Sequence, residues 1–503
     1  MIADNTPVII GVGQSVERID VVDYQGLSAA DLAARAARAA VSDCGADLLA
    51  HIDAIAAVRT FDDSFPFVPP FGVPDKFPRA IARRLGIDPS YAALASLGGD
   101  TPIALIGQMG ARIAAGATSA ALIVGGEAMS TVRHLTKLGE TRDWAEHDEG
   151  PVDDAGVRLE EVIKPYQVIH GLRGAPPVYG LIENARRGRL GSSKAAYAAS
   201  MGALFAPFVP VAAANPYASA PVEAMSGHDL IDVTARNRMV ADPYPVRLCA
   251  RDQVNQGAAL LMTSVGKARA LGITETRWIF VHGLATGTER DLIDRPDLSA
   301  VPSAVATIHA ALDVAGRGIT DIAHFDFYSC FPIAVFATAM DAMGIAPDDP
   351  RGLTVTGGLP FFGGPGNNYA THAVATMVER LRVRPGERGL VFANGGHMSK
   401  FGAIVLSSLP AAWREVTVIP PATAPAVAVD WHPTGPGHVL GYTVLYANGH
   451  PVRAVVIGDL DSGARFIANE ADAETLAQCL SRDIVGARVA VSTAADGNRF
   501  TLT

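Results

Sequence analysis

Cysteine is scarce in this chain. Its 503 residues include four cysteines, which stand far apart at Cys44, Cys249, Cys330 and Cys479. Their spacing matches no metal-ligand pattern, and four dispersed cysteines provide no disulfide framework. We therefore expect a reduced, cytoplasmic protein that has no structural disulfide and binds no metal.

Charge and long apolar runs are limited as well. Charged residues make up 18 % of the chain, the formal net charge is −10, and the basic residues occur in short clusters. This balance excludes nucleic acid as the main partner, because such a partner requires a basic surface. No uninterrupted apolar stretch reaches about 18 residues, so we expect no membrane span. The early segment PVIIGVG predicts a strand rather than a signal peptide.

The chain has enough hydrophobic residues to form more than one core. Hydrophobic residues make up 49 % of it, which is typical of a well-buried globular protein. A chain of this length exceeds the size of a single core, so two or three domains are expected.

The stretch Gly98–Ser130 is the one around which the rest is organised. A Gly-Gly turn precedes Asp100, Thr101 and Pro102, a combination typical of a helix start in which Thr101 accepts from free N–H groups. The helix that follows is small or apolar on nearly all sides, as a buried helix is. Its N-terminus forms a positive pole, where enzymes place nucleophiles or anions. The alternative is a tight turn without chemistry.

The order of helices and strands occurs twice along the chain. Strands and helices alternate, which is typical of a parallel α/β layer. The segment DTPIALIGQMGARIAAGATSAALIVGGE is matched by NNYATHAVATMVERLRVRPGERGLVFANGG, each with a turn, an apolar helix, a strand and Gly-Gly. The sequence therefore predicts two related α/β halves whose buried helices pack together. A further helix is expected over Phe331–Met343.

Two regions depart from this repeat. Residues 131–250 form a long insertion rich in Pro, Gly and polar residues, and an insertion of this length is usually functional. Residues 413–435 are dense in proline and predict a linker, and residues 436–503 predict short strands of a small β-barrel of oligonucleotide/oligosaccharide-binding (OB) type. Acidic loops in this C-terminal domain argue against nucleic acid, and the alternative is a packing module. The halves are then residues 1–130 with 251–270, and residues 271–412.

Four separated motifs occur in the order found in the thiolase superfamily. They are IAAGATSAALIVGGEAMS, NPYASAPVEAM, QGAALLM and TGGLPFFGGPGNNYATHAV. The resemblance covers about residues 5–410 and implies an α/β fold, the duplicated thiolase fold of five layers, αβαβα. Because a β module follows, the chain most resembles thiolase-like proteins of type 1, usually named acetyl-CoA acetyltransferases.

The resemblance implies binding of coenzyme A (CoA) thioesters and chemistry on carbon–carbon bonds beside the thioester. In thiolases a cysteine at the buried helix is acylated, a histidine activates it, a second cysteine moves a proton, and an Asn or His supports the oxyanion hole. The matching positions here hold Gly99, Gly364, Ala393 and Tyr328. A double-displacement thiolase mechanism is therefore not expected, and the glycine at position 99 is expected to open space at the helix pole.

Three residues remain as catalytic candidates. Tyr328 ends a buried strand and is a candidate acid or oxyanion donor, as tyrosines are in cysteine-free retro-aldolases of this fold; the alternative is a core tyrosine. Cys330 is a candidate nucleophile, although buried cysteines are mostly inert. His397 follows Gly-Gly and is a candidate base; the alternative is that it is a lone histidine without a catalytic role.

The candidate binding residues lie on the turns around these groups and in the insertion. Asparagine amides can donate to a thioester oxygen or simply form caps and turns, and arginines can pair with CoA phosphates or lie in a solvated face. Lys400 is a weaker candidate, for a Schiff base. The predicted binding set is Gly99, Asp100, Thr101, Gly364, Asn367, Asn368, Asn394, Arg187 and Arg189.

Three functional hypotheses follow. The first is an enzyme that makes or cleaves a carbon–carbon bond of a CoA thioester without an acyl-cysteine. The second is a non-catalytic acyl-CoA-binding protein, and the third is a scaffold subunit of a lipid- or steroid-degrading complex, with a protein partner on the C-terminal domain. None of them requires a covalently bound cofactor; the CoA thioester is the substrate or ligand.

Overall fold

Two sheets of the same strand order form the core of the computed structural model, which describes residues 2–157 and 159–503. The order in the first half is β2-β4-β8-β1, and in the second it is β10-β11-β12-β9. In each half the first pair is parallel and the two later pairs are antiparallel. This identity of order and direction confirms the predicted duplication. The strands are β1 (Pro7–Val16), β2 (Ala54–Ala57), β4 (Ala120–Glu127), β8 (Gln256–Ser264), β9 (Ile279–Thr288), β10 (His324–Phe327), β11 (Arg388–Gly395) and β12 (Lys400–Ser407).

The two sheets meet at one edge, and the first extends further. Val8 and Ile9 of β1 pair with Phe280 and Ile279 of β9, which joins the halves into a single sheet of 11 strands. Beyond β2, the first sheet adds β3 (Tyr91–Leu94) and β5 (Asp153–Asp154).

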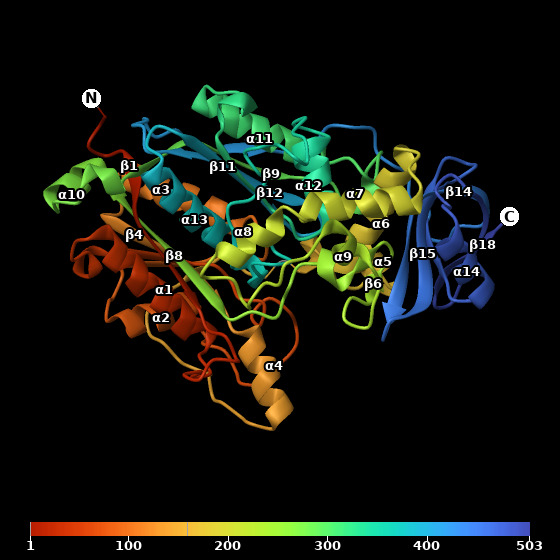
Figure 1. Ribbon diagram of the computed structural model, residues 1–503, viewed down its shortest axis with the longest axis horizontal. Helices are drawn as coiled ribbons and strands as arrows, with labels where there is room; N and C mark the ends of the chain where they lie inside the picture. Colours follow the sequence, from red (N-terminus) through yellow and green to blue (C-terminus); the bar gives the residue numbers. More distant parts are fainter. Residues whose placement is uncertain (1, 158) are drawn as a thin grey trace.

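Two buried helices lie between the sheets. α3 (Thr101–Ala114) and α13 (Tyr369–Val383) contact each other, and each contacts strands of both halves. α1 (Ala29–Cys44) covers the outer face of the first sheet, and α11 (Pro302–Ala315) covers that of the second (Figure 1). The predicted helix pair and the five-layer arrangement are both confirmed.

Small residues bring the outer helix close to its sheet. Ser28 caps α1 by accepting from the backbone N–H of Asp31. A Cβ atom on Gly13 of β1 would lie 2.2 Å from the carbonyl oxygen of Ala36, so only glycine allows this approach. α2 (Phe77–Leu85) packs beside α1.

The segment after β10 differs from its prediction. The expected helix Phe331–Met343 is instead α12 (Pro332–Val335) followed by a π-helical turn, Phe336–Met340. Within this turn the Thr338 hydroxyl donates to the Ala334 carbonyl at 2.5 Å.

The insertion is mainly helical and ends in a hairpin. Its elements are α4 (Met129–Leu138), α5 (Pro165–Ile169), α6 (Ala175–Arg189), α7 (Lys194–Phe205), α8 (Phe208–Ala214), α9 (Gly227–Ile231), β6 (Met239–Ala241) and β7 (Tyr244–Pro245). The segment Lys194–Ala214 spans 21 residues with a mean hydropathy of 1.5, so by length and composition it could cross a membrane. This corrects the expectation that no such segment exists. About 44 % of its most apolar window is buried in the fold, and core helices of soluble proteins pass the same test.

The strands of the C-terminal domain pair in a closed ring, β14-β15-β16-β18-β17-β14. They are β14 (Gly435–Ala447), β15 (His450–Leu460), β16 (Arg465–Glu470), β17 (Arg488–Ala494) and β18 (Gly497–Leu502), with α14 (Ala473–Ser481) between β16 and β17. The ring encloses its own apolar cluster, which includes Val439, Tyr442 and Phe466. Its assignment to the OB type stays a prediction.

The C-terminal domain is tied to the rest of the chain at several places. Within the proline-rich segment, β13 (Thr417–Ile419) pairs with β9 of the core sheet. The indole of Trp413 packs against Gly110 of α3, where a Cβ would lie 2.2 Å from it. β14 also pairs with β6 of the insertion, so the two domains share a sheet.

Candidate functional site

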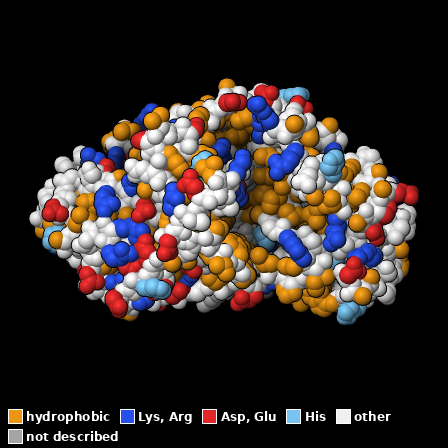
Figure 2. Space-filling model, turned by 90° about the horizontal axis from the view of Figure 1, so that it is seen from below, with side chains coloured by type: hydrophobic (Ala, Val, Ile, Leu, Met, Phe, Trp, Pro, Cys, Tyr) orange, Lys and Arg blue, Asp and Glu red, His pale blue; other side chains and the backbone are white. Residues whose placement is uncertain are grey.

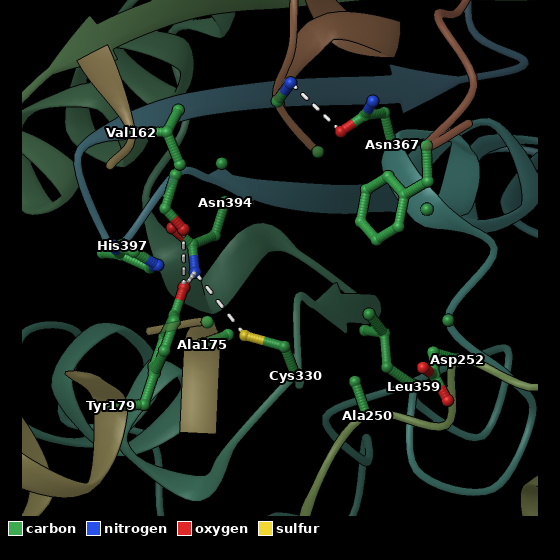
Figure 3. A pocket seen from close by; sticks show the side chains of 18 of the residues that line it. Val162, Ala175, Tyr179, Ala250, Asp252, Cys330, Leu359, Asn367, Asn394 and His397 are labelled. Carbon is green, nitrogen blue, oxygen red and sulfur yellow. Dashed lines mark hydrogen bonds between the residues drawn. The ribbon is translucent and has the colours of Figure 1, made fainter. Parts of the chain in front are cut away.

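A cavity of about 360 Å³ lies at the N-terminus of α3, where β10 and β11 end and the insertion covers them (Figure 3). Its volume is within the range of small-molecule sites. It brings together seven residues that the sequence singled out: Gly99, Tyr328, Cys330, Gly364, Asn367, Asn394 and His397. The apolar part of its wall includes Phe61, Phe65, Val162, Phe331 and Leu359.

Tyr328 fills the place to which a side chain at position 99 would point. A Cβ built on Gly99 would lie 2.5 Å from the Tyr328 hydroxyl oxygen and 2.6 Å from the backbone oxygen of Asn394. The expectation that Gly99 opens space is therefore wrong, because the phenol occupies it. Tyr328 is buried, and its hydroxyl makes no hydrogen bond to any residue that the structure describes.

Burial keeps three titratable groups of the cavity neutral at neutral pH. Burial raises the pKa of the Tyr328 phenol well above its usual value, and raises the pKa of the Cys330 thiol to about 12. Burial lowers the pKa of His397 to about 4. Cys330 is thus a protonated thiol rather than a thiolate, which argues against a nucleophilic role. Near Gly99 the cavity therefore offers uncharged donors and acceptors, and its charged lining residue is Asp252, which pairs with Arg133.

Asn394 and Tyr179 form a hydrogen-bonded pair on one wall. The Asn394 Nδ2 donates to the Tyr179 hydroxyl at 2.9 Å and to the Cys330 sulfur at 3.8 Å, and the Tyr179 hydroxyl donates to the Gly396 carbonyl at 3.2 Å (Figure 3). The Asn394 Oδ1 is buried without a partner among the described residues. Tyr179 comes from α6, where no local pattern in the sequence distinguished it.

Asn367 and Thr101 support the Gly98-Gly99 turn rather than a ligand. The Asn367 Oδ1 accepts from the Gly98 N–H at 3.1 Å, and its Nδ2 donates to the Arg59 carbonyl at 2.9 Å. The Thr101 hydroxyl donates to the Gly98 carbonyl at 2.8 Å, instead of accepting from helix N–H groups as predicted. Both side chains are already engaged, which corrects their assignment as ligand donors.

Asp100 and Asn368 lie beside the cavity without lining it. Asp100 occupies the N-cap position of α3, but its side chain makes no capping hydrogen bond. A Cβ on Gly395 would lie 2.0 Å from the Asp100 Oδ1, so the carboxyl group packs against β11. The Asn368 amide packs against Gly125, where a Cβ would lie 2.4 Å from its Oδ1.

Arg187 and Arg189 do not reach the cavity, so their placement does not support a role in phosphate binding. The Arg187 guanidinium is 1 % exposed, and it donates to the Tyr442 hydroxyl at 2.8 Å and to Asp483 at 2.9 Å. Arg189 pairs with Asp341 at 2.8 Å. Arg187 instead fastens the C-terminal domain to α6.

Other arginines stand at the entrance. A more polar hollow of about 730 Å³ shares Pro176, Cys249, Ala250 and Asp252 with the cavity. Figure 2 shows a hollow in the face seen from below, with apolar side chains inside and Lys and Arg side chains beside it. Three of the arginines are spaced over residues 238–251 and one lies in α4, and no two of them are adjacent in the sequence. They are Arg133, Arg238, Arg247 and Arg251.

The structure offers two further observations on chemistry. Among the described residues, no group of three or more His, Cys, Asp or Glu side chains is arranged to hold a metal ion. The Lys400 ammonium donates to the Leu97 carbonyl at 3.4 Å and lines a neighbouring cavity rather than this one.

Comparison with known proteins places the chain in a family. The family model described as the thiolase-like protein type 1 additional C-terminal domain matches residues 417–497. A crystal structure of a monomeric SCP2-thiolase-like protein type 1 from Mycobacterium smegmatis is 41 % identical, with 100 % of both chains covered and a TM-score of 0.85.

More distant structures share the fold. The aldolase described as Ltp2-ChsH2(DUF35) is 16 % identical over 81 % of this chain and 99 % of its own, with a TM-score of 0.60. The dimeric peroxisomal thiolase of Saccharomyces cerevisiae is 14 % identical over 80 % of this chain and 98 % of its own, with a TM-score of 0.58. No curated protein matches. From the identity along its whole length, the chain belongs to the family of thiolase-like proteins of type 1.

Proposed function

We propose that this protein binds a CoA thioester and cleaves or forms a carbon–carbon bond beside the thioester without an acyl-cysteine intermediate. The observation that carries the proposal is the Tyr328 hydroxyl, which lies unbonded at the helix pole where a side chain at position 99 would point. A neutral phenol there can donate to the oxygen of a thioester enolate, the group that such a reaction must stabilise.

The entrance supports a CoA ligand. Its four arginines lie next to the mouth of the cavity, where they can pair with phosphates. The acyl group then enters the apolar cavity between Phe61, Phe331 and Leu359. Arg133 is already paired with Asp252, so Arg238, Arg247 and Arg251 are the better candidates for phosphate contacts.

The reaction proposed is of retro-aldol type, on a 3-hydroxyacyl thioester. His397, neutral at neutral pH, accepts the hydroxyl proton, the bond between the α- and β-carbons breaks, and its electron pair passes into the thioester enolate. Tyr328 donates a hydrogen bond to the enolate oxygen, and a proton then returns to the α-carbon. The products are a carbonyl compound and a shorter acyl thioester.

Tyr328→Phe tests this proposal. Purified protein is titrated calorimetrically with acyl-CoA and assayed for cleavage of 3-hydroxyacyl-CoA. Tyr217→Phe is the matched control, because the Tyr217 hydroxyl likewise makes no hydrogen bond to a described residue and lies outside the cavity. We expect loss of turnover in Tyr328→Phe alone. Turnover unchanged by Tyr328→Phe, or an acyl-enzyme detected by intact mass, refutes the mechanism.

A second candidate function is binding without turnover. The protonated thiol of Cys330 and the weakly basic His397 leave the cavity without a strong base or nucleophile. Acyl-CoA binding without cleavage of any 3-hydroxyacyl-CoA supports this candidate. Absence of both binding and turnover supports the scaffold hypothesis, for which the fold neighbour described as the Ltp2-ChsH2(DUF35) aldolase is suggestive, because its description names two components.

A further inference from the structure

A second cavity, of about 260 Å³, lies behind His397. It shares His397 and Val162 with the first cavity, so these two side chains form a common wall. The other walls come from the end of β9, the start of β12, the loop 291–295 and the insertion at 164–167. Whereas Asp252 is the charged residue in the lining of the first cavity, this one is lined by five charged side chains.

Arg295 is a buried cation, and one of its guanidinium nitrogens makes no hydrogen bond to a described residue. Its guanidinium is 2 % exposed; the Nε donates to the Arg290 carbonyl at 3.0 Å, and the Nη2 donates to the carbonyls of His397 and Met398 at 3.1 and 2.8 Å. The Nη1 is buried and has no partner among the described residues, and the same holds for the Ser399 hydroxyl. Both residues line this cavity, so two buried donors in its wall have no acceptor among the described residues.

The carboxylates nearby are already engaged. The two oxygens of Glu289 each accept from a backbone N–H, of Arg290 and of Ser303, both at 2.9 Å. Asp291 accepts from the Tyr166 hydroxyl and pairs with Lys164 at 3.6 Å.

The charged residues that line the cavity are Lys164, Arg295, Lys400, Glu289 and Asp291. Burying a guanidinium group is costly unless an anion pairs with it. A negatively charged ligand with two acceptor oxygens would suit the unpartnered Arg295 Nη1 and Ser399 hydroxyl.

We propose that this second cavity binds a carboxylate group, held by the Arg295 Nη1 and the Ser399 hydroxyl with the charge of Lys164 nearby. A carboxylate supplies two oxygens, one for each donor. It can belong to a free small dicarboxylic acid. It can also end an acyl chain that passes His397 from the first cavity, and this second source rests on the proposed acyl-CoA binding.

Succinate is the first probe. Wild type, Ser399→Ala and Lys164→Met are titrated calorimetrically with succinate, with chloride at equal ionic strength as the control for the ligand and Lys137→Met, in exposed α4, as the control for the substitution. Because hydrogen bonds to charged groups contribute about 1.5–3 kcal/mol, we expect succinate to bind and Ser399→Ala to weaken it about tenfold or more. Arg295 itself is left intact, since it supports three carbonyls.

Glutaryl-CoA and butyryl-CoA distinguish the two sources. If the carboxylate ends an acyl chain, wild type binds glutaryl-CoA more tightly than butyryl-CoA, and Ser399→Ala removes the difference. Succinate binding that survives both substitutions overturns the proposal. So does the joint absence of succinate binding and of a glutaryl preference. If neither CoA ester binds but succinate does, the proposed acyl-CoA function fails and the carboxylate site stands.

Discussion

Replacing Gly99 by alanine tests whether the phenol of Tyr328 excludes a side chain from the helix pole. The added methyl group would lie 2.5 Å from the Tyr328 hydroxyl oxygen, 2.8 Å from its Cζ and 2.6 Å from the Asn394 carbonyl oxygen. Non-bonded heavy atoms attract at about 3.5 Å or beyond, so three contacts are too close by up to about 1 Å. The Asn394 oxygen belongs to β11 and cannot move without disturbing the sheet. We therefore expect Gly99→Ala to lower the free energy of unfolding by about 1–3 kcal/mol.

Gly364→Ala is the matched control, because it makes the same change in the same cavity. There the closest atom to the new methyl group would be the Arg251 carbonyl oxygen at 3.3 Å, so a small adjustment accommodates it. Urea unfolding, followed by tryptophan fluorescence, compares the two variants.

A double-mutant cycle locates the cause of the Gly99→Ala effect. Tyr328→Ala removes two of the three close contacts, so part of the Gly99→Ala penalty should disappear on that background. Equal stability of Gly99→Ala, Gly364→Ala and wild type would show that the phenol does not occupy this place.

Four further predictions follow from the contacts described. Tyr328→Phe should change the free energy of unfolding by less than about 0.5 kcal/mol, because no protein hydrogen bond is lost; a larger loss in urea unfolding would reveal a structural role. Cys330 should react with iodoacetamide at pH 7.5 far more slowly than free cysteine, because its pKa is raised to about 12; rapid labelling by mass spectrometry would contradict this. Burial lowers the pKa of His397 from 6.5 to about 4, so the unfolded chain binds the extra proton between these values. Its contribution to stability should be complete above about pH 6.5 and fall as the pH decreases toward 4, by about 1.4 kcal/mol per pH unit, and His397→Gln should flatten urea-derived stability over that range. Asp483→Ala should leave the buried Arg187 charge without its carboxylate, loosen the C-terminal domain and speed its release by limited proteolysis; an unchanged cleavage rate would refute this.

The sequence predicted the fold well because local signals carry it. Helix starts such as Ser28, the apolar helix after Asp100 and the repeated strand–Gly-Gly pattern are all readable within a few residues. The helix expected over Phe331–Met343 was predicted only in part, because the apolar pattern does not distinguish an α-helix from the π-helical turn at Phe336–Met340.

The site was predicted only in part, since contacts between distant segments decide it. Strand ends and turns located Tyr328, Asn394 and His397 at one cavity. That Tyr328 fills the space beside Gly99 depends on a contact between the two halves, which no local pattern encodes. In the same way, a cluster of arginines in sequence indicated Arg187, whereas the arginines at the entrance come together only in the fold.

Helix α6 makes the cavity wall depend on the C-terminal domain. Tyr179, Glu183 and Arg187 follow one another at intervals of four residues, on one face of this helix and over about 12 Å. Tyr179 bonds to Asn394 and Gly396, Glu183 accepts from the Tyr244 hydroxyl at 2.7 Å, and Arg187 bonds to the C-terminal domain. A helix fixed at both ends has less freedom to tilt than a helix fixed at one. The C-terminal ring of strands thus limits the motion of α6 and of the cavity wall that α6 forms. The position of Tyr179 in the cavity therefore depends on residues in the C-terminal domain.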